Sequence, residues 1–223
     1  MAAKPRTRVT RMPSRANYER EAVEAILDEA IVSHVGTVSP AGHPVVIPTL
    51  HARAGEWLYI HGSAASPTLR RAEQAEICLT ATLLDGLVLA RSAVHHSVNY
   101  RSAVVYGQPE RIDDAEGKCA ALEAFTEKLI PGRWGDARLP TAQELKGTAV
   151  LRIPLDEASA KVRTGGPVEE EADYELPVWA GTVGLRLAAD APQPDERIMP
   201  GIKCPDYVTN LVRAKAQHGR AGD

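Results

Sequence analysis

Short turns separate the apolar runs in the first third of the chain, and this spacing limits the fold more than any other feature. Residues 34–39, 44–52 and 56–61 are rich in β-branched and aromatic side chains, as strands are. The segments between them, 40–43 and 54–55, contain proline and glycine, which favour turns. A parallel strand pair needs a crossover of a dozen or more residues, which these turns cannot hold. The chain therefore predicts a mostly antiparallel sheet and argues against a parallel, Rossmann-type sheet.

The rest of the chain extends this pattern and adds helices. We expect Asp85 and Gly86 to form a turn between two strands, and the acidic run at 169–173 to be a linker. Further strands are expected at 77–83, 87–91, 100–112 and 148–155. Helices are expected at 17–32 (capped by Asn17), 113–130 (capped by Asp113 or Asp114 and burying Leu122, Phe125 and Leu129) and 141–147 (opened by a capping box of Thr141 and Glu144). Pro48 cannot donate to a ladder, so its side of the strand must face an edge, a bulge or a ligand. The fold class is α+β (mainly β), an antiparallel barrel of about six strands with flanking helices.

The chain divides into three parts by composition. Residues 1–16 are basic and interrupted by proline, and we expect a flexible, solvated N-terminal arm. Residues 17–190 hold the strands and form the barrel domain. Residues 191–223 are punctuated by proline and glycine and are expected to lie on the surface as a C-terminal tail.

Composition excludes several classes of function. The net charge of −3 argues against a protein that binds nucleic acid through bulk electrostatics. Three cysteines without a CxxC spacing indicate free thiols in a reducing compartment. No apolar run is long enough to span a membrane and no secretory signal precedes the domain, so we expect a cytoplasmic protein without a membrane partner.

The densest polar cluster of the chain, HHSVNYRS at 95–102, runs directly into the β-branched strand AVVYG at 103–107. Such a strand suits the mouth of a barrel, where a polar ligand group meets an apolar core. A polar loop followed by an ordinary core strand explains the same sequence equally well. Arg101 approaches the core and needs a partner, because a buried guanidinium without one is very costly. An anionic ligand is favoured as that partner, with Asp85 or a distant carboxylate as the structural alternative.

A second polar segment, GSAASPTLRR at 62–71, predicts a short helix. Ser66 is a good N-cap and Pro67 a good first helical residue. Hydroxyls, free N–H groups and two arginines at such a helix start form a reasonable anion site. A capped helix with solvated arginines is the simpler explanation of this segment taken alone. The nucleotide-binding patterns GxxxxGK[ST] and GxGxxG are absent from the sequence.

Seven histidines suggest a metal, but their spacing does not support a zinc site. There is no HExxH and no CxxC, so no metal site is predicted. His95 and His96 are adjacent, and on a strand they would point to opposite faces. No GxSxG elbow is present, which disfavours a serine hydrolase.

Four segments together resemble the flavin-binding split barrels related to pyridoxamine 5'-phosphate oxidase, in the branch that includes nitroimidazole-resistance proteins. The resemblance covers roughly residues 15–200, and its third segment is long and specific. The segments are HVGTVSPAGHPVVIP (34–48), YIHGSAASPTLRR (59–71), DGLVLARSAVHHSVNYRSAVVYGQPER (85–111) and VWAG (178–181). It implies a six-stranded split barrel that forms a homodimer and holds flavin mononucleotide (FMN) between two subunits.

The resemblance also implies roles for individual residues. Strand residues would lie along the isoalloxazine ring, a loop would take the phosphate, and the polar cluster with a tryptophan would add further contacts. The strand residues at the ring are Val46, Ile47, Pro48 and Thr49. The residues at the phosphate are His61, Ser63, Ser66 and Arg70. The further contacts come from Asn99, Tyr100, Arg101, Ser102 and Trp179. Two features of the oxidases are missing: the lysine of the phosphate loop, for which Arg70 or Arg71 must stand in, and the C-terminal substrate motif. Their absence argues against pyridoxamine phosphate as the substrate.

Two functions follow from the resemblance. The first is an FMN-dependent oxidoreductase that takes electrons from a nicotinamide cofactor and passes them to a small-molecule acceptor. The second is a non-catalytic split barrel that stores or senses flavin or haem, or a haem-degrading relative. The resemblance brings in haem because split-barrel relatives include haem-degrading proteins, and His51, His61 and His96 are then the candidates for its axial ligand. A deazaflavin is an alternative cofactor. The sequence assigns no general acid or base.

Overall fold

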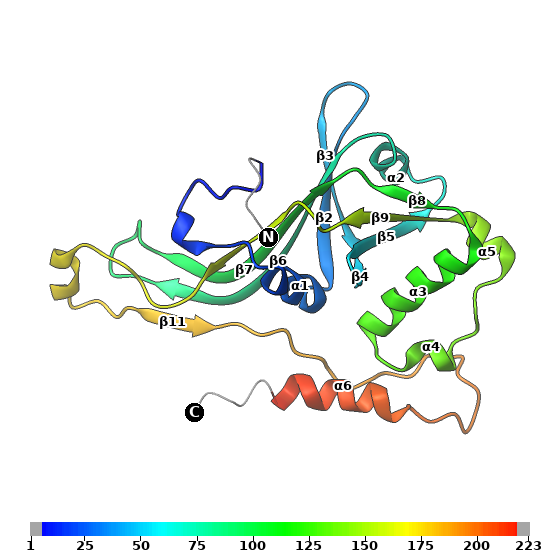
Figure 1. Cartoon of the computed structure of the whole chain (residues 1–223). Coiled ribbons are helices and arrows are strands. Elements are labelled where there is room, and N and C mark those ends of the chain that lie inside the picture. Colours follow the sequence, from blue (N-terminus) through cyan, green and yellow to red (C-terminus); the bar gives the residue numbers. More distant parts are fainter. Residues whose placement is uncertain (1–5, 218–223) are drawn as a thin grey trace.

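The computed structural model describes residues 6–217 of the chain, with side chains described through residue 211. Its strands form two antiparallel sheets that close into a split barrel, which confirms the expected fold class (Figure 1). The larger sheet has the order β1-β10-β7-β6-β2-β3, and β11 pairs with β6 beside it. Its strands are β1 (Ala16–Asn17), β2 (Val32–Val38), β3 (Pro44–Leu50), β6 (Ile77–Leu89), β7 (Ser97–Gly107), β10 (Ala158–Arg163) and β11 (Gly181–Gly184).

The smaller sheet has the order β4-β5-β9-β8 and faces the larger one across the core. It consists of β4 (Ala52–Ala54), β5 (Trp57–Ser63), β8 (Glu110–Ile112) and β9 (Thr148–Pro154). Apolar side chains that alternate along β5 and β9 are fully buried, as period-two strands place them. Leu58, Ile60, Leu151 and Ile153 therefore form the centre of the core with Leu79 and Val105 of the larger sheet.

Helices cover the rim and one end of the barrel. They are α1 (Arg20–Glu29), α2 (Pro67–Ala72), α3 (Ala115–Leu129), α4 (Arg133–Asp136), α5 (Ala142–Gly147) and α6 (Asp206–Gln217), with 3-10 turns at Pro13–Arg15 and Glu171–Glu175. The capping box that Thr141 and Glu144 predict is present at the start of α5. Asp114 caps α3, as expected for one of the two aspartates. No helix in the described part is long and apolar enough to cross a membrane.

Two expectations for the helices are wrong. Asn17 does not cap α1, because it belongs to β1 and its Oδ1 accepts from the N–H of Glu19, so the helix begins at Arg20. In α3, Phe125 is buried, but Leu129 is 39% exposed and Lys118 takes an inner position instead. The C-terminal segment, expected as a surface tail, contains the helix α6.

Asp85 and Gly86 do not form a turn, and β6 runs through them as one continuous strand. The pairing with β7 passes from Leu84 directly to Gly86, so Asp85 is the extra residue of a β-bulge. A Cβ on Gly86 would lie 2.9 Å from the carbonyl oxygen of Val183, which explains why glycine is needed where β11 packs. The outer halves of β6 and β7 and the segment around β11, residues 84–100 and 168–184, project from the barrel in Figure 1 as an elongated arm.

The N-terminal segment, expected to be solvated, and the acidic segment, expected to be a linker, both contact other parts of the fold. In the N-terminal segment, Thr7 is 3% exposed and Arg6 pairs with Glu76 and Glu157. The segment at 161–173 does not simply leave the domain, because its first residues belong to β10 beside β7. The side chain of Glu169 is completely buried against the arm. Local charge predicts solvation only when no complementary donor lies nearby in the fold.

Candidate functional site

A small hollow of about 90 Å³ lies where β3, β5 and α2 meet. Four of the residues assigned to the flavin site line it, although they come from three separate segments of the chain. Its lining consists of Val35, Ile47, Thr49, Ile60, His61, Gly62, Ser66, Thr68 and Leu69. Val35, Ile60 and Leu69 were not assigned, and their signal was the ordinary alternation of core strands and helices. The hollow is apolar on one side and carries hydroxyls on the other.

The apolar side of the hollow belongs to β3, which ends its sheet. Of the edge, bulge or ligand that Pro48 was expected to face because it cannot donate to a ladder, the structure contains the edge. Val46 and Ile47 of the same strand are 62% and 40% exposed. An edge strand with uncovered apolar side chains and free backbone groups is suited to a flat ligand that also needs hydrogen bonds.

The polar side consists of the loop 63–66 and helix α2. Ser66 Oγ accepts from the N–H of Leu69 at 3.4 Å, so the expected N-cap is present. Ser63 Oγ accepts from the N–H of Ala65 at 3.1 Å. Both hydroxyls therefore hold the loop in shape, and each keeps its own proton for another acceptor.

Arg70 and Arg71 lie at the end of this helix without acidic partners. Arg70 Nε donates to the carbonyl of Ala64 at 3.3 Å, and an Nη of Arg71 donates to Thr68 Oγ1 at 3.3 Å. Within residues 6–211, neither guanidinium forms an ion pair with a carboxylate. Arg71 Nε is also buried without a partner. Two uncompensated guanidinium groups next to hydroxyl donors are suited to a phosphate.

His61 connects the two sides of the hollow. Its ring packs edge-on against Phe125, with the ring centroids 4.2 Å apart. Burial lowers the pKa of His61, so the imidazole is neutral at pH 7. Its Nδ1 is buried and has no hydrogen-bond partner in the described part of the chain.

Arg101 is not free to bind an anion, which corrects our preferred interpretation of this residue. Its guanidinium is bidentate to Glu29 of α1 and to Asp85 of the bulge, with one Nη 2.8 Å from an oxygen of each carboxylate. These hydrogen bonds, first to Glu29 and then to Asp85, raise the pKa of Arg101. The structural alternative that named Asp85 or a distant carboxylate is therefore the arrangement observed. The bulge brings Asp85 to face Arg101, and no sequence pattern indicated Glu29.

The other assigned residues on β7 and beyond it lie away from the hollow. Asn99 donates to the carbonyl of Gly165 and accepts from Arg163, while Ser102 Oγ donates to the carbonyl of Lys161. Two strands, β6 and β2, separate β7 from β3. At about 4.8 Å per strand this is a separation of ~14 Å. Tyr100 shares this position on β7, and Trp179 lies 68% exposed on the arm.

The two adjacent histidines lie in the turn between β6 and β7, not on a strand as assumed. His96 Nδ1 is 3.1 Å from the carbonyl oxygen of Ser92. His95 Nδ1 lies 3.8 Å from Asp173 Oδ2, and with Glu169 these side chains place their ligand atoms within 4.8 Å of one another. Arg91 and two backbone N–H groups already occupy Glu169, so we assign this group a structural role.

A larger hollow of about 440 Å³ lies between α3 and α5, but it contains none of the assigned residues. Two of its three cations are already engaged: Arg111 pairs with Glu73 and Asp113, and Lys118 donates to two carbonyls at the end of α5. The smaller hollow is the better candidate for a cofactor, because assigned residues line it and the adjoining helix α2 carries Arg70 and Arg71.

A sequence profile described as pyridoxamine 5'-phosphate oxidase matches residues 19–162. The chain belongs to this family. No curated protein sequence matches it. Among solved structures, the flavocytochrome Anf3 from Azotobacter vinelandii is 42% identical with a TM-score of 0.89, and the match covers 93% of this chain and 96% of that one. The FAD and heme binding protein from Mycobacterium smegmatis is 35% identical with a TM-score of 0.84, and that match covers 89% and 97%.

A third structure shares the fold alone. It is a putative 5-nitroimidazole antibiotic resistance protein from Bacteroides thetaiotaomicron, 22% identical with a TM-score of 0.57. The match covers 66% of this chain and 86% of that one. The two more similar structures match nearly the whole chain.

Proposed function

We propose that this protein is a redox protein that binds a flavin and a haem. Electrons from a nicotinamide cofactor would reach the flavin and pass to the haem and a small-molecule acceptor. The observation that carries the flavin assignment is the pair of unpaired arginines, Arg70 and Arg71, beside the apolar edge strand β3. Two relatives that cover nearly the whole chain, a flavocytochrome and an FAD and haem binding protein, support both cofactors.

The hollow, together with the edge strand and the helix beside it, offers different surfaces to the two parts of a flavin. The isoalloxazine ring would lie along β3 over Val46 and Ile47, where backbone groups of the edge strand supply hydrogen bonds. The phosphate would lie at Ser63, Ser66 and Arg70, because a doubly charged group needs cations and hydroxyl donors. A bound flavin supplies hydride and single-electron transfer. The residues of this chain hold and orient it, and the neutral His61 can donate a hydrogen bond to it.

FMN and FAD share this phosphate and ring, so the hollow serves either of them. FMN is the cofactor that the family resemblance implies, and FAD is the one named for the relative from Mycobacterium smegmatis. Mass spectrometry of the released cofactor distinguishes them, and it also detects a deazaflavin.

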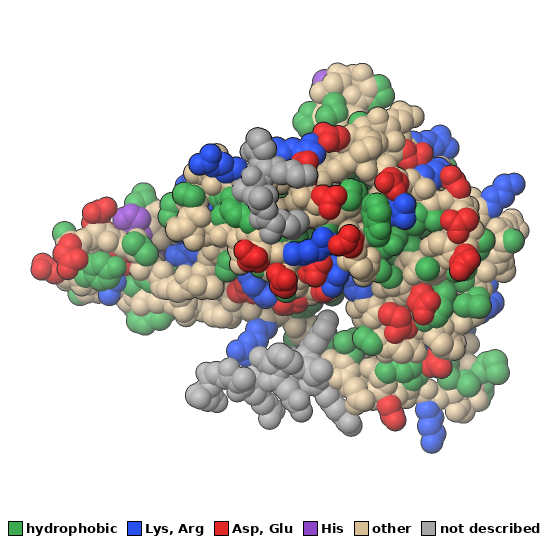
Figure 2. Space-filling model, viewed as in Figure 1, with side chains coloured by type: hydrophobic (Ala, Val, Ile, Leu, Met, Phe, Trp, Pro, Cys, Tyr) green, Lys and Arg blue, Asp and Glu red, His purple; other side chains and the backbone are tan. Residues whose placement is uncertain are grey.

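A homodimer explains why the assigned residues form two separate groups. The arm exposes a series of apolar side chains, and Figure 2 shows hydrophobic groups across its visible face. These include Leu84, Leu87, Val94, Val98, Val178, Trp179 and Val183. We propose that the arm packs against a second copy of the chain. The polar group around Asn99 and Trp179 would then approach the partner's flavin hollow, where the family resemblance places it.

One experiment separates this function from a non-catalytic carrier. The purified protein should show both a flavin spectrum and a haem Soret band, and anaerobic NADH or NADPH should bleach the flavin and then reduce the haem. Cofactors that bind but do not accept electrons from either nucleotide indicate storage or sensing instead. A protein that binds neither cofactor, even after reconstitution, refutes the proposal.

A further inference from the structure

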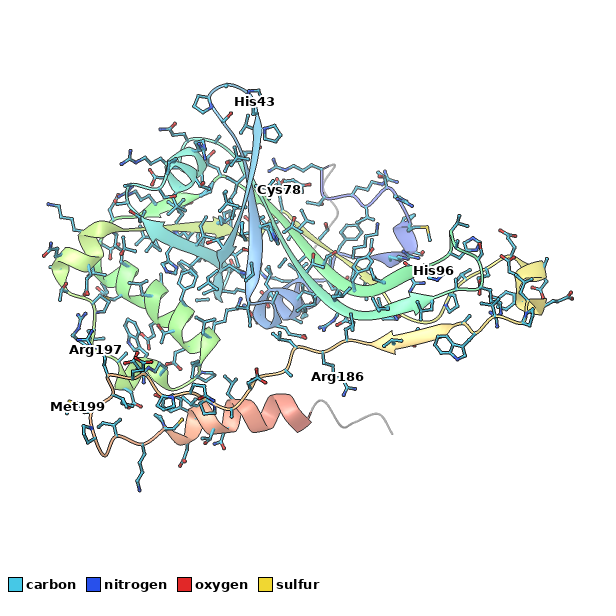
Figure 3. The ribbon with its side chains drawn as sticks, turned by 180° about the vertical axis from the view of Figure 1, so that it is seen from behind. His43, Cys78, His96, Arg186, Arg197 and Met199 are labelled. Atoms are coloured by element: carbon cyan, nitrogen blue, oxygen red, sulfur yellow. The ribbon has the colours of Figure 1, made fainter. Side chains whose placement is uncertain are left out.

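The turn at the end of the arm holds one imidazole in a defined orientation. His96 Nδ1 lies 3.1 Å from the carbonyl oxygen of Ser92, and a carbonyl can only accept. The proton of the neutral ring is therefore on Nδ1, and the lone pair is on Nε2. His96 is exposed, so Nε2 is accessible from outside the chain. Figure 3 shows His96 on the arm, well away from His43 at the β2–β3 turn.

This arrangement is the one that metal-bound histidines adopt. A ligating imidazole almost always donates its other N–H to a carboxylate or a backbone carbonyl, which fixes the tautomer and the ring orientation. Among the histidines at positions 34–96, His96 alone combines this donation with an exposed ring. His34 and His43 are exposed but make no side-chain hydrogen bond within the described residues.

The other candidates fit an axial role less well. His51 is 1% exposed and its Nε2 lies 2.8 Å from the carbonyl oxygen of Leu27 and 2.9 Å from Lys128 Nζ, so it is occupied inside the protein. His61 lies in the flavin hollow, and its buried Nδ1 has no acceptor that would fix the tautomer. His95 Nδ1 is 3.8 Å from Asp173, which is too long for a hydrogen bond.

Buried contacts hold the turn behind His96. The fully buried carboxylate of Glu169 accepts from the N–H groups of Arg91 and Ser92 and from the Arg91 guanidinium. Burial opposes ionisation of Glu169, but these donors outweigh it and lower its pKa. The N–H of His95 donates to the same Ser92 carbonyl that orients His96. The carbonyl is thus fixed in place before any ligand binds.

Apolar side chains lie beside His96 on the arm. Val94 and Val98 flank it and are 83% and 37% exposed, and the arm carries further uncovered apolar side chains. A haem bound at Nε2 needs apolar surface as well as an imidazole, and it would lie against these side chains where the arm meets the second copy of the proposed dimer.

We propose that His96 Nε2 is the axial ligand of the haem iron. This inference rests on the proposed function, since it assigns the position of one of its two cofactors. The buried Glu169 acts on it as a positioning residue, by way of Arg91 and Ser92.

The test compares matched variants, each reconstituted with haem and with flavin and examined by optical and electron paramagnetic resonance spectra. H96A should lose most of its haem, or show a changed axial-ligand signature, while it retains flavin and the circular dichroism of the parent protein. H95A controls for the neighbouring position and H61A for the flavin hollow, and both should keep the parent haem spectrum. E169Q should weaken haem binding by about 10- to 100-fold, the range for groups that orient a ligating histidine.

The outcomes separate the inference from the proposed function. If the parent protein binds haem and H96A keeps the same haem content and axial signature, the inference is wrong and the function stands. If H95A or H61A loses the haem in place of H96A, the ligand is assigned to the wrong histidine. If the parent protein takes up flavin but no haem under any reconstitution, both the inference and the haem part of the function fail.

Discussion

Arg101 joins three parts of the fold, and its removal should reduce stability without affecting flavin binding. Its guanidinium is bidentate to Glu29 at the end of α1 and to Asp85 in the bulge of β6. All three side chains are between about a third and a half exposed, so solvent screens the pairs. The variant R101A also leaves two carboxylates that no longer share a counter-ion.

The magnitude follows from the type of contact. An exposed ion pair contributes up to about 1 kcal/mol, and a hydrogen bond to a charged group ~1.5–3 kcal/mol where water is partly excluded. We expect R101A to lower the free energy of unfolding by about 1–3 kcal/mol. For a chain of this size this corresponds to a decrease of ~2–12 °C in Tm.

The assay is thermal and urea unfolding of the cofactor-free protein, followed by flavin titration of the folded variant. R186A is the matched control, because Arg186 is exposed on the segment after β11 and forms no ion pair within residues 6–211. Its Tm should equal that of the parent. An R101A protein with an unchanged Tm that has lost its flavin would refute the structural role and restore Arg101 as a ligand to the cofactor.

Three further changes test other parts of the structure. R70A should weaken flavin binding by about 10- to 100-fold with little change in Tm, because Arg70 has no acidic partner to lose; equal affinity would exclude it from the phosphate site. Burial and the charge of Lys128 lower the pKa of His51 to about 4. The unfolded state therefore takes up a proton first, and stability that is complete above pH 6.5 should fall by up to about 3 kcal/mol as the pH drops to 4, an effect that H51F should remove. G86V should detach β11 from β6, because a side chain there meets the Val183 carbonyl, and hydrogen exchange along the outer half of β6 should increase; unchanged protection contradicts the close packing.

Local patterns in the sequence determined the elements that depend on neighbours along the chain. The helix start at Ser66 and Pro67 and the capping box of Thr141 and Glu144 were predicted because a cap hydrogen bond spans only three residues. Pro48 was placed at an edge because a residue without an N–H cannot sit in the middle of a sheet. The class of fold followed from the same short-range signals, since short turns permit only antiparallel neighbours.

Other short-range signals were ambiguous. The Asp85–Gly86 pair is typical of a turn, and it is equally compatible with the bulge that the structure contains. The pairing partner decides between them, and β11 lies almost a hundred residues further along the chain. Glu169 was ambiguous for the same reason. Its neighbours in the sequence are acidic, which suggests solvation, but its carboxylate accepts hydrogen bonds from the N–H groups of Arg91 and Ser92, almost eighty residues earlier in the chain.

The candidate site shows most clearly what the sequence determined and what it did not. Arg70, Arg101 and His96 all belong to polar segments that could bind a ligand. Their neighbours in the sequence did not show which of the three side chains would be left without a partner inside the protein. The fold gave Arg101 two carboxylates from other elements, left Arg70 with none, and fixed the tautomer of His96 through a backbone carbonyl. The sequence alone thus determined which chemical groups are present and the local structure that carries them. Only the tertiary structure decided which groups are free to act, because a charge is neutralised by whatever the fold brings within a few ångströms, however distant it is in the chain.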